Sequence, residues 1–231
     1  MKTLVIIPWP NAPLPGLPEG VESKALNDGV PLRGYLDVAR NEHLFLDAVV
    51  QAEKDGYDAV LSLCFADTGI EVARKLVDIP VLGCTRVGIH VCGILGHKAC
   101  VLQPDFELNY YTTKHTIDSY NMGDFAQIVN PGVDSMAAFA SANAYNSTGL
   151  VTPPLQSLVD ACVKSIKEDN TDVITFGSGA LVGAENAIHT ELKKIGYDIP
   201  VVNPMAAAIG LANVLSALKL TQSRFGYPRG V

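Results

Sequence analysis

The chain has 231 residues, 48% of them hydrophobic and 18% charged, so it can bury a large core and is not a disordered polypeptide. Its formal net charge is −7 and no run of more than two Lys or Arg occurs, which excludes the basic surface of a nucleic-acid-binding protein. No apolar run approaches the roughly 18 residues that cross a membrane. Five cysteines without a CxxC pair indicate neither a disulfide framework nor a zinc site, so we expect a cytoplasmic protein without a metal.

Strand-like and helix-like segments alternate through the first half of the chain. TLVIIP (residues 3–8) predicts a strand, followed by a Pro- and Gly-rich loop over residues 10–34 and a helix over residues 41–55. Next come a strand at DAVLSLC, a helix over residues 68–77, a strand at IPVLGC, a helix over residues 86–95 and a strand at KACVLQ. This alternation predicts an α/β fold built from parallel sheets.

The second half repeats the same order. A helix over residues 154–169 precedes DVITFGS, and a helix over residues 184–195, the strand IPVVN and a helix over residues 206–218 follow. Asp58 and Asp172 each open a strand, and Cys64 and Ser178 each stand six positions later. We therefore expect two pseudosymmetric lobes, residues 1–103 with 206–231 carrying Cys64, and residues 104–205 carrying Ser178.

The two equivalent strand ends are the candidate site. The carboxyl ends of parallel strands form the ligand crevice of α/β proteins, so Cys64 and Ser178 approach the same cleft if the lobes face each other. A helix N-terminus beside Cys64 is expected to lower the pKa of its thiol and favour the thiolate. A thiolate can take a proton from a carbon next to a carbonyl, provided that donors stabilise the enolate. Serine titrates far above cysteine, so the pair predicts a one-base site in which Ser178 positions the substrate.

Three segments resemble a known family. DAVLSLCFADTGIEVARKLVDIPVLG resembles the first active-site segment of the hydantoin racemases, in the aspartate/glutamate racemase superfamily, and VITFGSGAL is similar to the second. The tail TQSRFGYPRG resembles the family's TSK-x-G-x-Y ending. The resemblance implies two lobes, no cofactor, a small-molecule substrate with a carboxylate or ring carbonyl, and proton transfer at its α-carbon by two cysteines.

The resemblance also assigns individual residues. Cys64 matches the first catalytic cysteine, and Ser178 stands where the second is expected. The positions that match substrate-contacting residues of the family are Asn11, Phe65, Ala66, Gly177 and Gly179. The remaining cysteines, Cys84, Cys92, Cys100 and Cys162, are expected to be structural.

Three functions remain open from the sequence. The first is a cofactor-independent racemase or epimerase of an amino-acid-derived substrate such as a hydantoin, ureido acid or amino acid. The second is a one-base lyase, decarboxylase or cis-trans isomerase of a small carboxylic acid that uses Cys64 alone, and the third is a two-lobed small-molecule binding protein. The sequence does not distinguish a natural Ser178 from an engineered Cys-to-Ser replacement. We expect a homo-oligomer.

Overall fold

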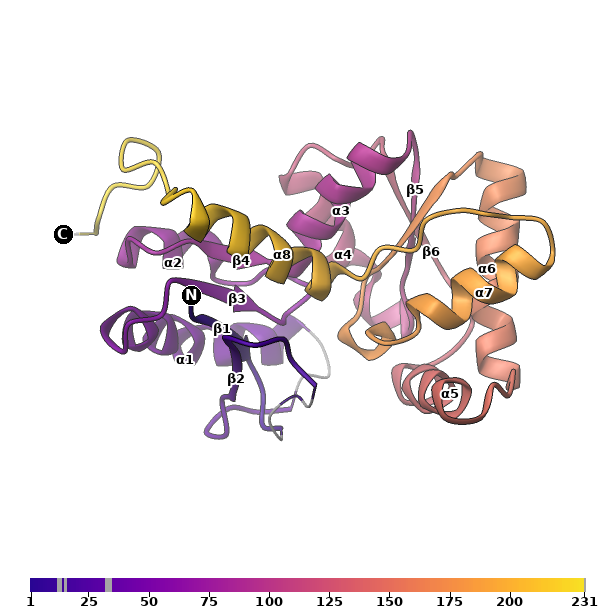
Figure 1. Ribbon diagram of the computed structural model, residues 1–231, viewed down its shortest axis with the longest axis horizontal. Coiled ribbons are helices and arrows are strands. Elements are labelled where there is room, and N and C mark those ends of the chain that lie inside the picture. Colours follow the sequence, from indigo (N-terminus) through magenta and orange to yellow (C-terminus); the bar gives the residue numbers. More distant parts are fainter. Residues whose placement is uncertain (12–13, 15, 32–34, 231) are drawn as a thin grey trace. The chain divides into compact units, whose positions relative to one another are not determined.

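The computed structural model describes residues 1–11, 14, 16–31 and 35–230, with the elements labelled in Figure 1. The chain divides into two compact units, residues 1–87 with 206–231 (unit 1) and residues 88–205 (unit 2). Each unit contains one parallel sheet with helices, which confirms the predicted α/β class with two lobes. Two helices, α3 (Cys84–Leu95) and α8 (Pro204–Ala217), each contain a unit boundary.

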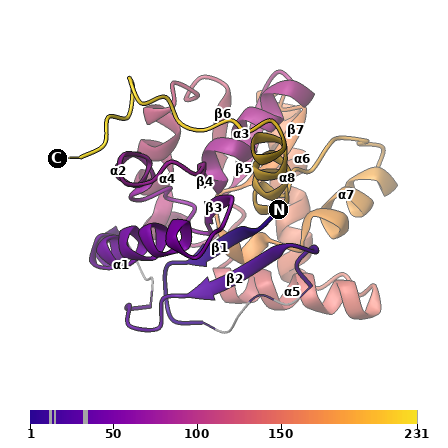
Figure 2. The ribbon, with the colours of Figure 1, turned by 60° about the vertical axis from the view of Figure 1, so that its left-hand side comes forward.

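Unit 1 is built on a four-stranded parallel sheet in the order β2-β1-β3-β4. Its strands are β1 (Thr3–Ile7), β2 (Val21–Ala25), β3 (Ala59–Ser62) and β4 (Val81–Gly83). Figure 2 shows β1 and β2 running side by side, with Thr3 opposite Val21. Two further helices belong to this unit, α1 (Tyr35–Lys54) and α2 (Ile70–Leu76). The sheet and helices together place the ends of β3 and β4 next to each other.

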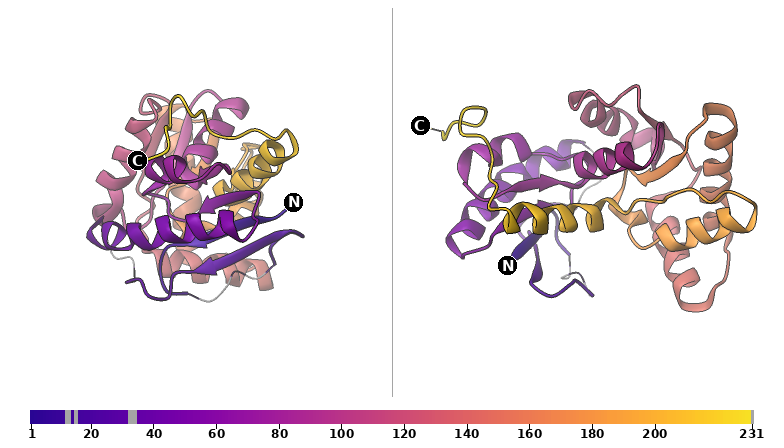
Figure 3. Two further views of the ribbon diagram at one scale, coloured as in Figure 1. Left: turned by 90° about the vertical axis from the view of Figure 1, so that its left-hand side faces the viewer. Right: turned by 45° about the horizontal axis from the view of Figure 1, so that its top comes forward.

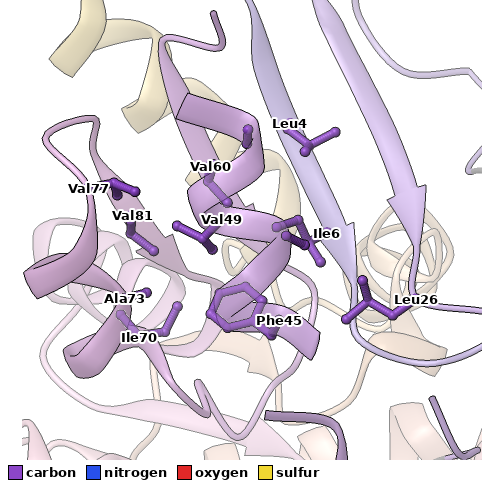
Figure 4. Packing of buried hydrophobic residues seen from close by; sticks show 12 residues of the cluster. Leu4, Ile6, Leu26, Phe45, Val49, Val60, Ile70, Ala73, Val77 and Val81 are labelled. Carbon is purple, nitrogen blue, oxygen red and sulfur yellow. The ribbon is translucent and has the colours of Figure 1, made fainter. Parts of the chain in front are cut away.

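The core of unit 1 lies between its sheet and α1. Phe45 and Val49 stand four residues apart on α1, so both fall on one face of the helix. Figure 4 shows them among Ile6, Val60 and Ile70, and all five side chains are at most 1% exposed. Full burial of each such side chain stabilises the fold by about 1.5–3 kcal/mol, so this face of α1 holds the helix on the sheet.

Unit 2 has a three-stranded parallel sheet in the order β6-β5-β7. Its strands are β5 (Ala99–Leu102), β6 (Ala126–Val129) and β7 (Val173–Phe176). Its helices are α4 (Phe106–Ser119), α5 (Ser135–Thr148), α6 (Pro153–Asp169), α7 (Glu185–Lys194) and the short 3₁₀ helix η1 (Gly179–Leu181). The strand expected at IPVVN forms a single bridge between Val201 and Ile174.

The two sheets repeat each other in their hydrogen bonds. Asp58 and Asp172 precede β3 and β7, and the carboxylate of each accepts a backbone N–H just before the neighbouring strand, from Lys2 at 2.6 Å and from His97 at 2.8 Å. The prolines of the two Ile-Pro-Val segments likewise accept a backbone N–H from the adjacent strand, each at 2.9 Å. The internal repeat read from the sequence is therefore present at the level of single contacts.

The structure differs from the sequence-based expectations at three places. The lobe boundary expected after residue 103 lies between Val87 and Gly88, because β5 pairs with β6 and β7 and so belongs to unit 2. The loop expected over residues 10–34 contains β2, an edge strand that buries only Val21 fully and so carries a weak apolar signal; residues 12, 13, 15 and 32–34 lie outside the described part. The elements α5 and β6 were not anticipated from the sequence.

Candidate functional site

Cys64 lies two residues beyond β3, at the carboxyl end of a central strand. The preceding Leu63 still follows the sheet, since its N–H donates to Ile6 O at 2.9 Å. The chain then turns, and the N–H of Asp67 donates to Cys64 O at 3.0 Å. Gly69, with φ at 74°, begins α2 in the left-handed region that glycine adopts without strain. The sequence LSLCFADTG therefore holds Cys64 in a tight turn before a helix N-terminus.

The Cys64 thiol is enclosed by its own turn. The residue is 5% exposed, and its sulfur lies 4.0 Å from Thr68 Oγ1. Burial raises the pKa of the thiol, the Asp67 carboxylate raises it further, and hydrogen bonds from the N–H groups of Ala66 and Thr68 act in the opposite direction. The expectation of a lowered pKa is thus wrong, because the loss of solvent outweighs the donors of the turn. The surroundings of Cys64 therefore favour the neutral thiol over the thiolate.

Asp67 fastens the Cys64 turn to α3. Its carboxylate accepts the N–H groups of Thr85, at 3.2 Å, and Arg86, at 2.8 Å, in the first turn of that helix. A Cβ on Gly83 would stand 2.3 Å from the Asp67 carboxyl carbon, so only glycine leaves room for this contact. A third hydrogen bond, from Thr85 Oγ1 to Phe65 O at 2.6 Å, connects the same turn to α3. An anion at a helix N-terminus is stabilising, so the turn is fixed by charge as well as by shape.

A small cavity adjoins the thiol within unit 1. It is lined by Pro8, Val38, Asn41, Glu42, Phe45, Cys64 and Thr68 and has a volume of about 10 Å³. That volume holds about one water molecule. Asn41 is 2% exposed and braces this region, since its amide donates to Pro8 O and Val30 O at 2.7 Å and accepts the Val30 N–H at 2.8 Å.

Ser178 occupies the equivalent position in unit 2. The N–H of Gly177 donates to Leu102 O at 2.8 Å, just as the N–H of Leu63 donates to Ile6 O in unit 1. Ser178 and Cys64 each come one residue after this last sheet hydrogen bond. Ser178 caps η1, and its Oγ accepts the Ala180 N–H at 3.3 Å. Gly177 also allows a close approach, because a Cβ there would lie 2.4 Å from Gln103 Oε1. Ser178 and Gly179 are half-buried.

The sequence profile described as Asp/Glu/Hydantoin racemase matches residues 27–212 of this chain. The chain belongs to the Asp/Glu/hydantoin racemase family. It is 24% identical over 196 residues to a hydantoin racemase of Paenarthrobacter aurescens, covering 84% of this chain and 76% of that protein. It is 20% identical over 195 residues to a hydantoin racemase of Pseudomonas sp. (strain NS671), covering 81% and 73%. The family makes the chain an enzyme of the racemase type.

Solved structures show the same fold as this racemase-family chain. The allantoin racemase from Klebsiella pneumoniae matches with a TM-score of 0.79 at 18% identity, covering 100% of this chain and 94% of that one. The allantoin racemase from Pseudomonas fluorescens matches with a TM-score of 0.80 at 19% identity, covering 100% and 97%. A double mutant of arylmalonate decarboxylase, with one glycine changed to cysteine and one cysteine to serine, matches at 0.62 and 18% identity, covering 98% and 97%.

The other predicted contact residues fall in different surroundings. Phe65 is buried and directs its carbonyl to α3, and Ala66 directs its N–H to the thiol, so both belong to the Cys64 turn. Asn11 is exposed and does not line the cavity beside Cys64. In this racemase-family chain, Asn41 lines that cavity together with Cys64.

Sequence reasoning missed Asn41, Asp67 and Thr68. Two of them lie inside the quoted motif CFADTG. Asn41 had its own signal, because it stands four residues before Phe45 and seven before Ala48, on the apolar face of α1. A polar residue on such a face indicates a buried hydrogen-bonding role.

The remaining cysteines are buried and form no disulfides. Cys84 follows β4 in unit 1, and burial raises the pKa of its thiol well above the usual value. Cys92, Cys100 and Cys162 lie in the core of unit 2.

Among the described residues, no three His, Cys, Asp or Glu side chains gather closely enough to hold a metal ion. No helix in the described ranges is both long and apolar enough to span a membrane.

Proposed function

We propose that this chain is a cofactor-independent racemase or epimerase of a hydantoin, ureido acid or amino acid, with Cys64 transferring the proton at the α-carbon. The observation that carries the proposal is the Cys64 turn, in a chain that belongs to a racemase family. The turn places a thiol, two backbone N–H donors and a helix N-terminus at one strand end. The hydantoin and allantoin racemases among the similar proteins support the substrate class.

The proton-transfer step uses Cys64 in both of its protonation states. As a thiolate, Cys64 takes the α-proton, the C–H bond breaks, and the electron pair moves onto the carbonyl oxygen as an enolate. The N–H groups of Ala66 and Thr68 hydrogen-bond the thiolate and offset part of its burial. As a thiol, Cys64 returns a proton to the same carbon. Racemisation also needs a proton on the opposite face, and we assign its delivery to a solvent water that the Ser178 hydroxyl orients, with the hydroxide neutralised by the proton that Cys64 releases to solvent.

A second candidate is a one-base lyase, decarboxylase or isomerase. Two features favour it: the burial that raises the pKa of Cys64 and so favours its proton-donating form, and a hydroxyl in place of a second thiol. A neutral thiol protonates a carbanion that another bond cleavage has formed. Ser178 then hydrogen-bonds the substrate. Because its hydroxyl caps η1, a serine at this position also has a structural reason that requires no catalytic role.

The deciding experiment follows hydrogen exchange at the α-carbon. Each enantiomer of a 5-substituted hydantoin, of allantoin and of an N-carbamoyl amino acid is incubated with the enzyme in D₂O. Deuterium content is read by NMR and handedness by circular dichroism. The proposal expects deuterium in both enantiomers and decay of the optical signal. Exchange in a single enantiomer without decay supports the one-base candidate and counts against racemisation.

A matched variant separates the remaining outcomes. Ser178→Cys introduces a second thiol and is expected to accelerate the interconversion of enantiomers, whereas Cys64→Ala is expected to abolish all exchange. The binding-protein alternative is favoured if these compounds bind saturably without any hydrogen exchange and if Cys64→Ala binds them with the same affinity. Homo-oligomeric assembly and a cytoplasmic location stay predictions, which size-exclusion chromatography with light scattering and cell fractionation can test.

A further inference from the structure

A second, larger cavity lies elsewhere in unit 1, beside the edge strand β4. Its volume is about 240 Å³, and it shares no lining residue with the cavity beside Cys64. Val81 and Leu82 of β4 contribute apolar surface, while Arg74 of α2 and Arg86 of α3 contribute charge. Pro80, Leu215 of α8 and the segment after α8, shown in yellow in Figure 3, contribute the rest. A cavity of this size is large enough for a small metabolite.

Two arginines line this cavity. Arg74 Nη1 lies 2.6 Å from Glu71 Oε1, and Arg86 Nη1 lies 3.3 Å from the same oxygen. Two guanidinium groups thus share one carboxylate, and no Asp or Glu is among the described residues that line the cavity. The Arg74 side chain is only 9% exposed, so solvent screens its charge poorly. The two guanidinium groups at the wall of the cavity favour an anion over a cation.

The cavity also contains an unsatisfied acceptor. Gln222 lines it, and Gln222 Oε1 is buried without a hydrogen-bond partner in the structure. A buried acceptor without a donor costs about 1–3 kcal/mol, which a ligand N–H recovers. The hydroxyl of Tyr227, 3.2 Å from Arg74 Nη1, and that of Thr221 add polar groups at the same wall.

We propose that this cavity binds a small carboxylate that carries an N–H donor, such as an acylamino or ureido acid. Arg74 and Arg86 hold the carboxylate, and Gln222 Oε1 accepts the N–H. The ligand contacts both the sheet side of the cavity and the C-terminal segment, so its binding stabilises the closed position of that segment. The site is independent of the chemistry at Cys64.

The C-terminal segment is suited to such control because it is held mainly by polar contacts at the surface. Arg224 donates to the carbonyls of Arg74, at 3.0 Å, and of Val77, and both Arg224 and Arg229 pair with Asp78. The Arg74 guanidinium lies 5.5 Å from the ring centre of Tyr227. Phe225 is fully exposed, and Leu218 and Leu220 are about half exposed. With so little apolar burial, local opening costs little, and a ligand can shift it strongly.

The test uses N-carbamoylglycine as the probe on the full chain in its Cys64→Ala form, which excludes turnover. Calorimetry measures binding, and hydrogen exchange of residues 218–230 measures closure. Arg86→Gln and Gln222→Leu are each expected to weaken binding about tenfold and to remove the slowing of exchange in this segment. Acetate lacks the N–H. It is therefore expected to bind the unmodified cavity more weakly than N-carbamoylglycine does, and to bind the Gln222→Leu form with the same affinity as N-carbamoylglycine.

The matched control is Arg229→Gln. Arg229 is on the same segment but pairs with Asp78 outside the cavity, so its loss is expected to leave the affinity for the probe unchanged. Gln222→Glu, a change of one atom on a half-buried residue, keeps the fold and is expected to repel the carboxylate. Absence of probe binding, or equal affinity in Arg86→Gln, Gln222→Glu and Arg229→Gln, overturns the proposal. Because Cys64 is absent throughout, neither result depends on the racemase assignment.

Discussion

The ends of β3 and β7 are equivalent in sequence and in sheet contacts, yet the structure completes them differently. At the end of β3, Cys64 sits in a turn that Asp67 attaches to α3 by two charged hydrogen bonds. At the end of β7, Ser178 caps only its own short helix η1 by one bond of 3.3 Å. The comparison teaches that the repeat preserves the position of the reactive residue, while the surrounding turn decides its chemistry.

The largest expected effect comes from removing the thiol. Cys64→Ala is expected to reduce turnover at least about a thousandfold, because the group that moves the proton is gone. Its effect on unfolding should be modest by comparison, since alanine keeps the Cβ and the change removes a single buried sulfur atom. Turnover in enantiomer-exchange assays and thermal unfolding measure the two effects. Cys84→Ala, in the same unit, is the control and should keep turnover, and loss of activity in both variants alike would contradict a special role for Cys64.

The next effect tests the attachment of the turn to α3. Gly83→Ala places a methyl group against the Asp67 carboxylate, so we expect a loss of about 2 kcal/mol in the free energy of unfolding and lower activity. Urea denaturation provides the measurement. Gly210→Ala in α8 has open space around its Cβ and is expected to stabilise by about 0.5–1 kcal/mol. Equal stability of the two variants would show that the Asp67 contact does not hold the turn.

A smaller effect concerns the charge beside the thiol. Asp67→Asn keeps the shape of the side chain but removes the negative charge that raises the pKa of Cys64. The pKa should therefore fall, and the rate of alkylation by iodoacetamide should rise severalfold near pH 8. The pH profile of alkylation, followed by mass spectrometry of the Cys64 peptide, should shift to lower pH. A profile that stays in place, or moves to higher pH, would contradict the electrostatic role of Asp67.

The smallest effect is expected at the end of β7. Ser178→Ala removes the cap of η1 and should cost about 0.5–1 kcal/mol of unfolding free energy. If Ser178 also contacts substrate, kcat/KM falls about tenfold, as expected for one lost hydrogen bond. Ser178→Thr keeps a hydroxyl and serves as the control. Unchanged kcat/KM in Ser178→Ala would restrict this residue to its structural role and favour chemistry by Cys64 alone.

Local patterns in the sequence were sufficient for the class of the fold and for the repeated strand ends. Apolar runs alternating with helical periodicity predicted the parallel strands, and the equal spacing from Asp58 to Cys64 and from Asp172 to Ser178 predicted the repeat. Local patterns failed at β2, whose strand character comes from pairing with β1 and not from its own residues. They also failed at the first unit boundary, which depends on the pairing of β5 with β6 and β7.

The sequence by itself determined the α/β class, the family and the residues at the two strand ends, because each is written in contiguous motifs. Only the tertiary structure decided the state of the Cys64 thiol, the capping of α3 by Asp67 and the gathering of Arg74, Arg86 and Gln222 around one cavity. These features depend on burial and on contacts between residues far apart in the chain. Desolvation of a thiol and the sharing of one carboxylate by two arginines arise only when the chain is folded.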